Sequence, residues 1–497
     1  MGRIIQKSLS FLAVGAVLAG FCSGAQAASM TVAMGSEPTS LDPQLVQDGG
    51  EWTVNDNIFE ALLIRTADGQ LQTGLAADIP TRINPTTWRV KLRPGIKFSN
   101  GESFNADAVV HSVNRIVDPN FKSRQLPFFS PIAKADKVDD LTVDVLTKGP
   151  DPALMTRLYY LKIVPVQASQ APDFANKPVG TGPYRFVEWT KGQKVVLERN
   201  PDYWGPKPEI ERVIFRFIKE PGTRLSGLQA GEFDFVHNLL PEFVKDVPQA
   251  VSTTGPLLTM IELDSRKSAG VTSDVRVRKA LNLAVDKNAL AQSLFEGFAS
   301  VADGQILESN WFGYNPNIKA YPYNPQAARK LLKEAGAEGA TIDIYGSNGR
   351  WLKDREITEA VAGYWEAIGL KVNVHIVEFS EYLDRLNDQK ARPQTIFIGH
   401  SNQLFDADRT DSAYLEPGRS GASNDNAEIG DLIKAARTEI EVTKRENLYR
   451  QIGQIAYDDA MFVFLLYHKD IFGLSKNLRW QPRADGKVLI KEITLAK

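Results

Sequence analysis

The pair Arg350-Trp351 has the chemistry to hold a charged ligand, because a guanidinium group binds carboxylates or phosphates bidentately and an indole ring stacks. The pair follows a predicted strand, 341–345, and precedes a predicted helix, 353–368, and a second strand, 370–377. This β-α-β order predicts a mostly parallel sheet with ligands at the carboxyl ends of its strands. The alternative is a surface arginine beside a tryptophan that only packs.

A second polar loop follows another predicted strand, 394–399. Its candidate ligand-binding residues are His400, Asn402, Gln403 and Asp406. A strand end again favours the ligand-binding edge of the sheet. The two amides would suit a polar ligand that is rich in hydroxyl or amide groups.

The region 179–208 contains a third group of candidates. Gly180 and Thr181 lie in a tight turn before a predicted hairpin, and Tyr203 and Trp204 follow that hairpin. Aromatic rings beside a glycine-rich turn suit a ligand cleft, because they offer contact area with few rotamers to freeze. The alternative is a hairpin corner in which the aromatic rings are part of the core.

An exported hydrolase of glycosides or peptides is the enzymatic alternative, and its support is the carboxylate pair Asp406 and Asp408. Two carboxylates this close on one loop need not converge on one bond. The 5 histidines are scattered without the spacing of a zinc site. No nucleophile elbow or phosphate-binding loop is present. We therefore expect no catalytic residue, no metal and no cofactor.

Residues 1–27 have the pattern of a secretory signal peptide: a basic start, an apolar run over 9–22, and Ala-Gln-Ala at 25–27. The apolar run is short for a bilayer span, so cleavage after Ala27 and export to the periplasm are predicted, with a membrane anchor as the alternative. A lipoprotein would need a small residue before Cys22, where Phe21 stands.

The rest of the chain has the composition of a globular protein of two or three domains. Removal of Arg3 and Lys7 with the leader takes the formal charge of −2 to −4. A mildly acidic surface argues against nucleic acid as a partner. Because the single cysteine lies in the leader, no disulfide is expected. We also expect a monomer.

Four local expectations concern elements that flank these loops. A helix is predicted over 54–64, and Asp234 is expected to face water at a strand end. Ser273 is expected to cap a helix that exposes Arg276 and Arg278.

Several motifs resemble the peptide/nickel class of bacterial periplasmic solute-binding proteins, solute-binding family 5, which deliver ligands to ABC importers. They are Thr-Trp-x-x-x-Leu-Arg-x-Gly-x-Lys-Phe-x-x-Gly at 87–101, Val-Gly-Thr-Gly-Pro-Tyr-Arg-Phe at 179–186, Arg-x-x-x-Leu-x-x-Gly-x-x-Asp at 224–234, Asp-x-Arg-x-Arg-x-Ala at 274–280 and Tyr-Asn-Pro at 323–325.

The resemblance implies an α/β fold of the type II periplasmic binding protein, with two lobes, a hinge and an inserted β-rich subdomain. The implied boundaries are 1–27 signal peptide, 28–60 lobe I (first part), 61–172 inserted subdomain II, 173–268 lobe I (second part), 269–477 lobe III and 478–497 the C-terminal return to lobe I. A peptide-like or other small polar solute would bind between the lobes and pass to an ABC permease in the inner membrane.

At Gln403 the sequence departs from the pattern of the family that it resembles. In peptide-binding members of the family, an aspartate at this place of the cleft loop pairs with the ligand's α-amino group. A neutral amide cannot supply the charge that a buried ammonium group requires. The departure argues against an ordinary peptide ligand, and the nickel-binding version of the loop is not matched either.

Overall fold

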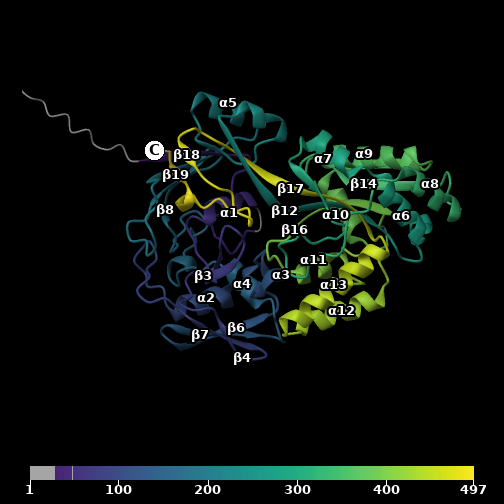
Figure 1. Cartoon of the computed structure of the whole chain (residues 1–497). Coiled ribbons are helices and arrows are strands. Elements are labelled where there is room, and N and C mark those ends of the chain that lie inside the picture. Colours follow the sequence, from purple (N-terminus) through teal and green to yellow (C-terminus); the bar gives the residue numbers. More distant parts are fainter. Residues whose placement is uncertain (1–27, 47–48, 391, 497) are drawn as a thin grey trace, which may run out of the picture.

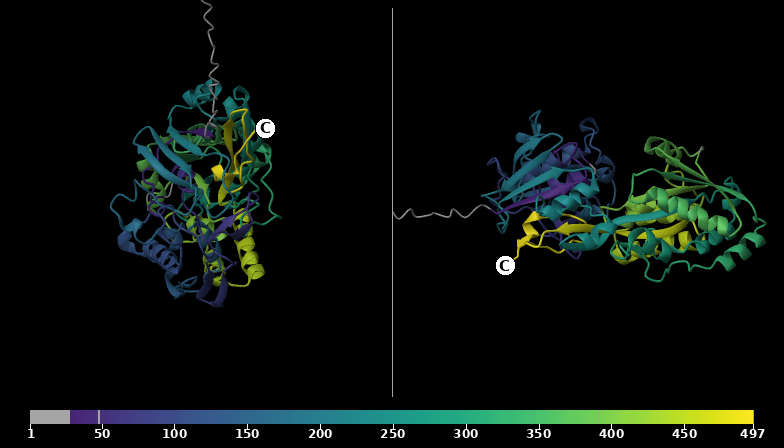
Figure 2. Two further views of the ribbon diagram at one scale, coloured as in Figure 1. Left: turned by 90° about the vertical axis from the view of Figure 1, so that its left-hand side faces the viewer. Right: turned by 90° about the horizontal axis from the view of Figure 1, so that it is seen from above.

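The computed structural model describes residues 28–46, 49–390 and 392–496. The predicted signal peptide, with Cys22, lies outside these residues. Figure 1 shows two bodies side by side, joined by the long strands β12 and β17. Figure 2, seen from above, shows the same two bodies with only a narrow connection between them. The two-lobed α/β architecture agrees with the fold class predicted from the sequence.

The larger sheet has 11 strands in the order β15-β14-β16-β12-β17-β11-β1-β10-β9-β8, and β13 pairs with β17. Its strands are β1 (Ser29–Met34), β8 (Tyr184–Thr190), β9 (Lys194–Arg199), β10 (Arg212–Phe217), β11 (Phe235–Val236), β12 (Gln249–Leu263), β13 (Ala299–Val301), β14 (Thr341–Ser347), β15 (Lys371–Val377), β16 (Thr395–Ser401) and β17 (Phe462–Leu474).

Strands β12 and β17 form an antiparallel ribbon that belongs to both lobes. One end of the ribbon pairs with β11 in the first lobe, and the other end pairs with β16 in the third lobe. The register of the ribbon shifts between Thr254 and Leu258. A β-bulge of this kind bends a strand, so the connection between the lobes is irregular where it crosses the gap.

The inserted subdomain has a sheet of its own in the order β4-β5-β7-β6. Its apolar core runs from Leu62 to Ile163 and takes in one residue of the third lobe, Leu404. The remaining strands are β2 (Leu63–Arg65), β3 (Leu71–Thr73), β4 (Thr81–Asn84), β5 (Thr87–Lys91), β6 (Ile132–Asp139), β7 (Thr142–Thr147), β18 (Leu478–Arg479) and β19 (Thr494–Leu495).

Several helices begin at a side chain that accepts a hydrogen bond from the first turn. Asn105 accepts from Ala108 N at the start of α2, and Asn324 accepts from Ala327 N at the start of α8. The helices are α1 (Gly49–Asn55), α2 (Ala106–Val117), α3 (Leu126–Phe129), α4 (Leu154–Tyr160), α5 (Pro221–Ala230), α6 (Val275–Ala284), α7 (Lys287–Phe295), α8 (Pro325–Glu334), α9 (Asp354–Ala367), α10 (Phe379–Asn387), α11 (Ala407–Tyr414), α12 (Ala427–Thr438) and α13 (Val442–Asp458). Short 3-10 turns are η1 (Pro119–Phe121), η2 (Ala168–Gln170), η3 (Pro241–Asp246), η4 (Gly270–Ser273) and η5 (Ile490–Glu492).

Three local predictions are wrong. The helix expected over 54–64 ends at Asn55, a turn and an irregular segment follow, and strand β2 begins at Leu63. Asp274, not Ser273, caps α6 by accepting from Arg276 N. Arg278 is buried, because its guanidinium group donates to the carbonyl oxygens that end neighbouring segments, including that of Asp459 at 2.8 Å.

Asp234 does not simply face water either. It is half-buried, and its carboxylate accepts from the backbone N–H of Thr31 at 2.8 Å. The parallel sheet expected in the third lobe is also smaller than predicted. Strand β14 pairs in parallel with β15 and β16, but β12 pairs antiparallel with β16 and β17. The crossing ribbon, which enters from the first lobe, imposes this mixed order.

No helix in the described part of the chain is both long and apolar enough to cross a membrane.

Candidate ligand-binding site

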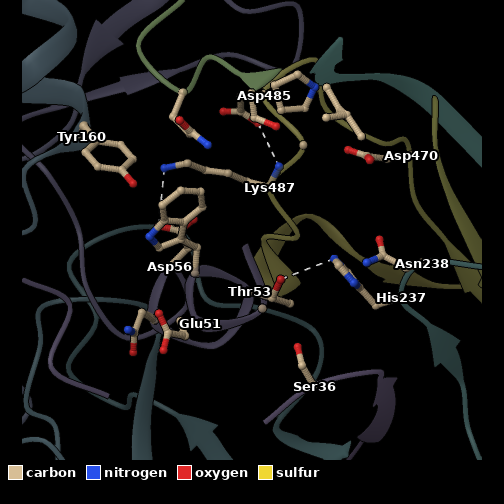
Figure 3. Close-up of a pocket in the computed structure, with 18 of the residues that line it drawn as sticks. Ser36, Glu51, Thr53, Asp56, Tyr160, His237, Asn238, Asp470, Asp485 and Lys487 are labelled. Atoms are coloured by element: carbon tan, nitrogen blue, oxygen red, sulfur yellow. Dashed lines mark hydrogen bonds and ion pairs between the residues drawn. The ribbon is translucent and has the colours of Figure 1, made fainter. Parts of the chain in front are cut away.

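A large cavity, with a volume of about 1180 Å³, lies between the lobes. Its lining comes from the first lobe, the inserted subdomain, the third lobe and the C-terminal return, so no single lobe forms the site. Residues of this lining that the argument uses are Asn55, Asp56, Arg124, Tyr160, Lys162, Arg350, Trp351, His400, Gln403, Arg409, Asp470 and Lys487. Figure 3 shows part of it, with Asp470 and Asp485 above and Ser36 and Glu51 below.

Four of the ten residues predicted from the sequence line this cavity: Arg350, Trp351, His400 and Gln403. They come from the loop after β14, from the end of β16 and from the loop after it, and the two strands are neighbours in the sheet. The strand-end rule therefore placed both loops at one edge, as expected.

Asn402 and Asp406 lie in the same loop but outside the cavity lining. The Asp406 carboxylate caps α11 and forms a buried ion pair with Arg445 at 2.6 Å. The buried Asn402 amide donates to Asp406 O and Thr410 Oγ1 at 2.9 Å each. Both side chains therefore fix the shape of the loop, and their hydrogen-bonding groups are used by the protein.

The candidates around the hairpin β8–β9 gather on a different group. Thr181, Tyr203 and Trp204 all donate to the buried carboxylate of Glu60, at 3.1, 2.8 and 2.7 Å. Gly180 packs against the backbone of residue Ile58. The hairpin-corner alternative describes the buried residues among these four, whereas the ring of Trp204 is exposed, and all four lie outside the cavity lining.

Arg350 has the geometry of a ligand-binding cation. Its guanidinium carbon lies 5.5 Å from the ring centre of Trp351 and 5.3 Å from that of Phe379, and it forms no ion pair with a described residue. Trp351 in turn packs against β16, where a Cβ atom at Gly399 would lie 2.5 Å from the indole ring. Glycine at that position lets the ring lie flat on the strand, which holds Arg350 at the mouth of the cavity.

The first turn of α11, which follows the loop after β16, contributes a second cation, Arg409. Its guanidinium group donates to Ser401 O and to the Gln403 side chain, and it lies 4.6 Å from the ring centre of Phe128 in the inserted subdomain. Burial lowers the pKa of Arg409 to about 10, so the group stays charged at neutral pH. Burial, and Arg409 beside it, hold the pKa of His400 well below its usual range, so His400 is neutral.

A buried ion cluster closes the opposite wall. Asp56 forms ion pairs with Lys162 and, at 3.4 Å, with Lys487. Burial acts to raise the pKa of Asp56, but the two ammonium groups outweigh it and the pKa is lowered. Burial lowers the pKa of Lys487 to about 8. The cluster ties the end of α1 to the C-terminal return, and both of its ammonium groups already have a carboxylate partner within the protein.

Sequence reasoning missed three polar groups of the cavity. Asn55 and Tyr160 have buried polar side-chain atoms without a hydrogen-bond partner among the described residues. Asp470 lies on β17 and lines the cavity with its carboxylate. Its signal is the run His-Lys-Asp at 468–470 inside an otherwise apolar strand, which is unusual for a buried segment.

The part of the chain that the structure describes contains no candidate metal site. No group of three or more His, Cys, Asp or Glu residues there is arranged to hold an ion.

Comparison with known proteins identifies the family. The model of bacterial extracellular solute-binding proteins, family 5, matches residues 70–421. This chain belongs to that family. It is accordingly the solute-binding component of an ABC importer, as the sequence predicted. The family's location outside the cytoplasm agrees with the export expected from the first residues.

Relatives and solved structures cover nearly the whole chain. The glutathione-binding protein GsiB of Pectobacterium atrosepticum is 28% identical over 469 residues, which are 90% of each chain. The structure of CtaP from Listeria monocytogenes superposes with a TM-score of 0.85, at 22% identity, over 95% of this chain and 100% of the other. HbpA2 from Haemophilus parasuis gives a TM-score of 0.84, at 23% identity, over 94% and 100%. These structural matches agree in fold, and the relatives give no support to a hydrolase.

Proposed function

We propose that this family 5 protein captures a short peptide-like solute that carries carboxylate groups and delivers it to an ABC permease. The observation that carries the proposal is the charge of the cavity wall. Arg124, Arg350 and Arg409 all line the cavity, and none has a carboxylate partner among the described residues. The lysines of the cavity wall, in contrast, are paired with Asp56.

Unpaired arginines suit a ligand that brings its own carboxylates. A guanidinium group binds a carboxylate through two parallel hydrogen bonds, which gives direction as well as affinity. The three arginines come from the inserted subdomain and from a loop and a helix of the third lobe. A ligand that contacts all of them therefore bridges the two bodies of the protein. Such bridging stabilises the closed arrangement, because the contacts exist only when the lobes meet.

Glutathione is the first candidate within this class. Its two carboxylates and one ammonium group match a cavity that holds several cations and a few carboxylates. Its size fits a cavity somewhat above the usual range of roughly 300–1,000 Å³ for small-molecule sites. The relatives named as glutathione-binding are 25–28% identical to this chain. We propose the same class of ligand for this chain.

The remaining expectations from the sequence are kept as parts of this proposal. The mature protein begins after Ala27 and acts in the periplasm as a monomer. The boundaries at 60, 172, 268 and 477 divide it into lobes that move about the β12–β17 ribbon. The solute leaves the protein chemically unchanged.

Calorimetric titration of the ligand-free protein tests the proposal. The protein is unfolded, dialysed and refolded to remove any retained solute, and is then titrated with glutathione, trialanine and a neutral sugar of similar size. We expect heat of binding with at least one peptide and none with the sugar. Mass spectrometry of the mixture after incubation should recover the peptide intact. Binding of the sugar alone, or cleavage of the peptide, would overturn the proposal.

A further inference from the structure

Asp470 lies on the β12–β17 ribbon that joins the two lobes. It lies on β17, pairs with Thr253 of β12, and is next to the register shift that begins after Thr254. It lines the main cavity and also a neighbouring cavity of about 640 Å³, which Arg350 shares. Figure 3 shows its side chain beside Asn238 and His237, at the edge of the site opposite Glu51.

Two glycines lie close to the carboxylate of Asp470. A Cβ atom at Gly255 would lie 2.7 Å from the carboxylate atoms, and one at Gly486 would lie 3.1 Å from an oxygen. The first glycine is in the bulged part of β12, and the second is in the C-terminal return. The backbone thus approaches the carboxylate closely from two sides, which leaves the cavity as its open side.

The described part of the chain supplies no side-chain partner for this carboxylate. No hydrogen bond or ion pair joins its side chain to another described residue. Its neighbours on the strand are engaged elsewhere, because His468 pairs with Thr259 Oγ1 at 3.0 Å and Lys469 donates to Gly297 O at 3.4 Å. Among the charged groups around it, Lys487 is paired with Asp56.

The other acids near Asp470 bring no cation to it. Asp485, next to Gly486, is paired with Arg483 at 2.8 Å. Glu308 is buried without a partner for Oε1, and burial, with Asp470 adding to it, raises the pKa of Glu308 to about 9. Burial alone raises the pKa of Asp470 to about 6. A half-buried carboxylate without a counter-charge is costly, and a bound cation would offset that cost.

We propose that Asp470 is the residue that binds the ligand's primary ammonium group. The proposal rests on the proposed function. It names Asp470 as the carboxylate that replaces the aspartate which peptide-binding members of the family have at the place of Gln403. The ligand then lies with its ammonium group at the β12–β17 ribbon and its carboxylates toward the arginines. Ligand recognition is thereby coupled to the strands about which the lobes move.

The test compares Asp470→Asn with wild-type protein on a matched pair of ligands. Glutathione carries the ammonium group, and glutaryl-Cys-Gly has the same skeleton and carboxylates without it. Wild-type protein should bind glutathione at least ~10-fold more tightly than the analogue, as a charged hydrogen-bonded pair requires. Asp470→Asn should lose this preference while binding the analogue as wild type does. Asp384→Asn, the same change on the exposed face of α10, should keep the preference.

Thermal unfolding separates a binding role from a structural one. Asp470→Asn removes an uncompensated charge, so the ligand-free variant should unfold at the same temperature as wild type or higher. A variant that keeps a wild-type preference for glutathione would overturn the role of Asp470 and leave the proposed function standing. Wild-type protein that binds neither glutathione nor trialanine would overturn the proposed function, and this role with it.

Discussion

Arg350 is an exposed cation of the cavity wall, and its guanidinium group lies over the rings of Trp351 and Phe379. Replacement by glutamine keeps a similar length and removes the charge. We expect Arg350→Gln to weaken glutathione binding by ~10-fold or more, as loss of a charged bidentate pair requires. The measurement is a calorimetric titration, and Arg355→Gln, on the exposed start of α9, is the control. Unchanged affinity in Arg350→Gln would contradict a carboxylate-binding role.

Asp470 gives ligand binding a pH dependence of definite sign. Because its pKa is raised to about 6 from a usual value of 3.8, it loses its charge as the pH falls through 6. Glutathione keeps its ammonium group protonated and its carboxylates ionised between about pH 5 and pH 7. Affinity should therefore fall by about 10-fold over that range in wild-type protein. In Asp470→Asn the same titrations should give a much flatter profile, and equal profiles would contradict the assignment.

Single residues were predictable from the sequence only where a strand end marked them. Arg350, Trp351, His400 and Gln403 follow strands that a sequence pattern reveals, so their shared edge could be inferred. Asp470 lies inside a strand, and its role depends on a glycine at 486 in another segment and on one at 255 that is far away in the sequence. Such long-range proximity has no local signal, so only the structure shows it.

The tight turn before the hairpin β8–β9 packs against the backbone at Ile58. A Cβ atom at Gly180 would lie 2.0 Å from the carbonyl oxygen of Ile58, so the backbone would have to move. We expect Gly180→Ala to lower the free energy of unfolding by about 3 kcal/mol, or to prevent folding. Gly149→Ala is the matched control, because nothing lies within 4 Å of its added atom. Equal chemical denaturation curves for the two variants would contradict this account.

Elements with a clear hydrophobic period were predicted well from the sequence, and irregular elements were not. The expected helix over 353–368 agrees with α9, and the strands before and after it agree with β14 and β15. The helix expected over 54–64 fails because its apolar spacing also suits a turn followed by a short strand. There the tertiary pairing of β2 with β3 outweighs the local helical pattern.

At the scale of the whole molecule, surface ion pairs join the two lobes. Lys353 at the start of α9 lies 3.7 Å from Glu242 of η3, and Lys245 lies 3.5 Å from Glu296. Partly exposed pairs of this kind contribute about 0.2–1 kcal/mol each. They can bias closure, but a ligand must supply most of the free energy that holds the lobes together.

Removal of one such pair should therefore weaken binding slightly. We expect Glu242→Gln to raise the dissociation constant of glutathione by no more than ~5-fold, because only part of the closure energy is lost. Glu359→Gln removes a similar exposed pair, with Arg355, that lies within one helix and should leave the constant unchanged. Competition binding measures both variants, and a larger effect in the control would contradict a role in closure.

The two-lobed plan could be predicted from motifs spread along the chain, whereas the size and charge of the space between the lobes could not. That space depends on how the β12–β17 ribbon bends and on side chains from four separate segments. The ion cluster at Asp56, for example, joins residues that are more than 400 positions apart.

Small-angle X-ray scattering, with and without the bound solute, tests most directly whether a solute is held between two moving lobes. The refolded, ligand-free protein is measured first, and then at a saturating concentration of glutathione that calorimetry has established. A smaller radius of gyration in the presence of glutathione is the predicted result. Identical scattering curves for the free and the saturated protein would contradict capture by closure.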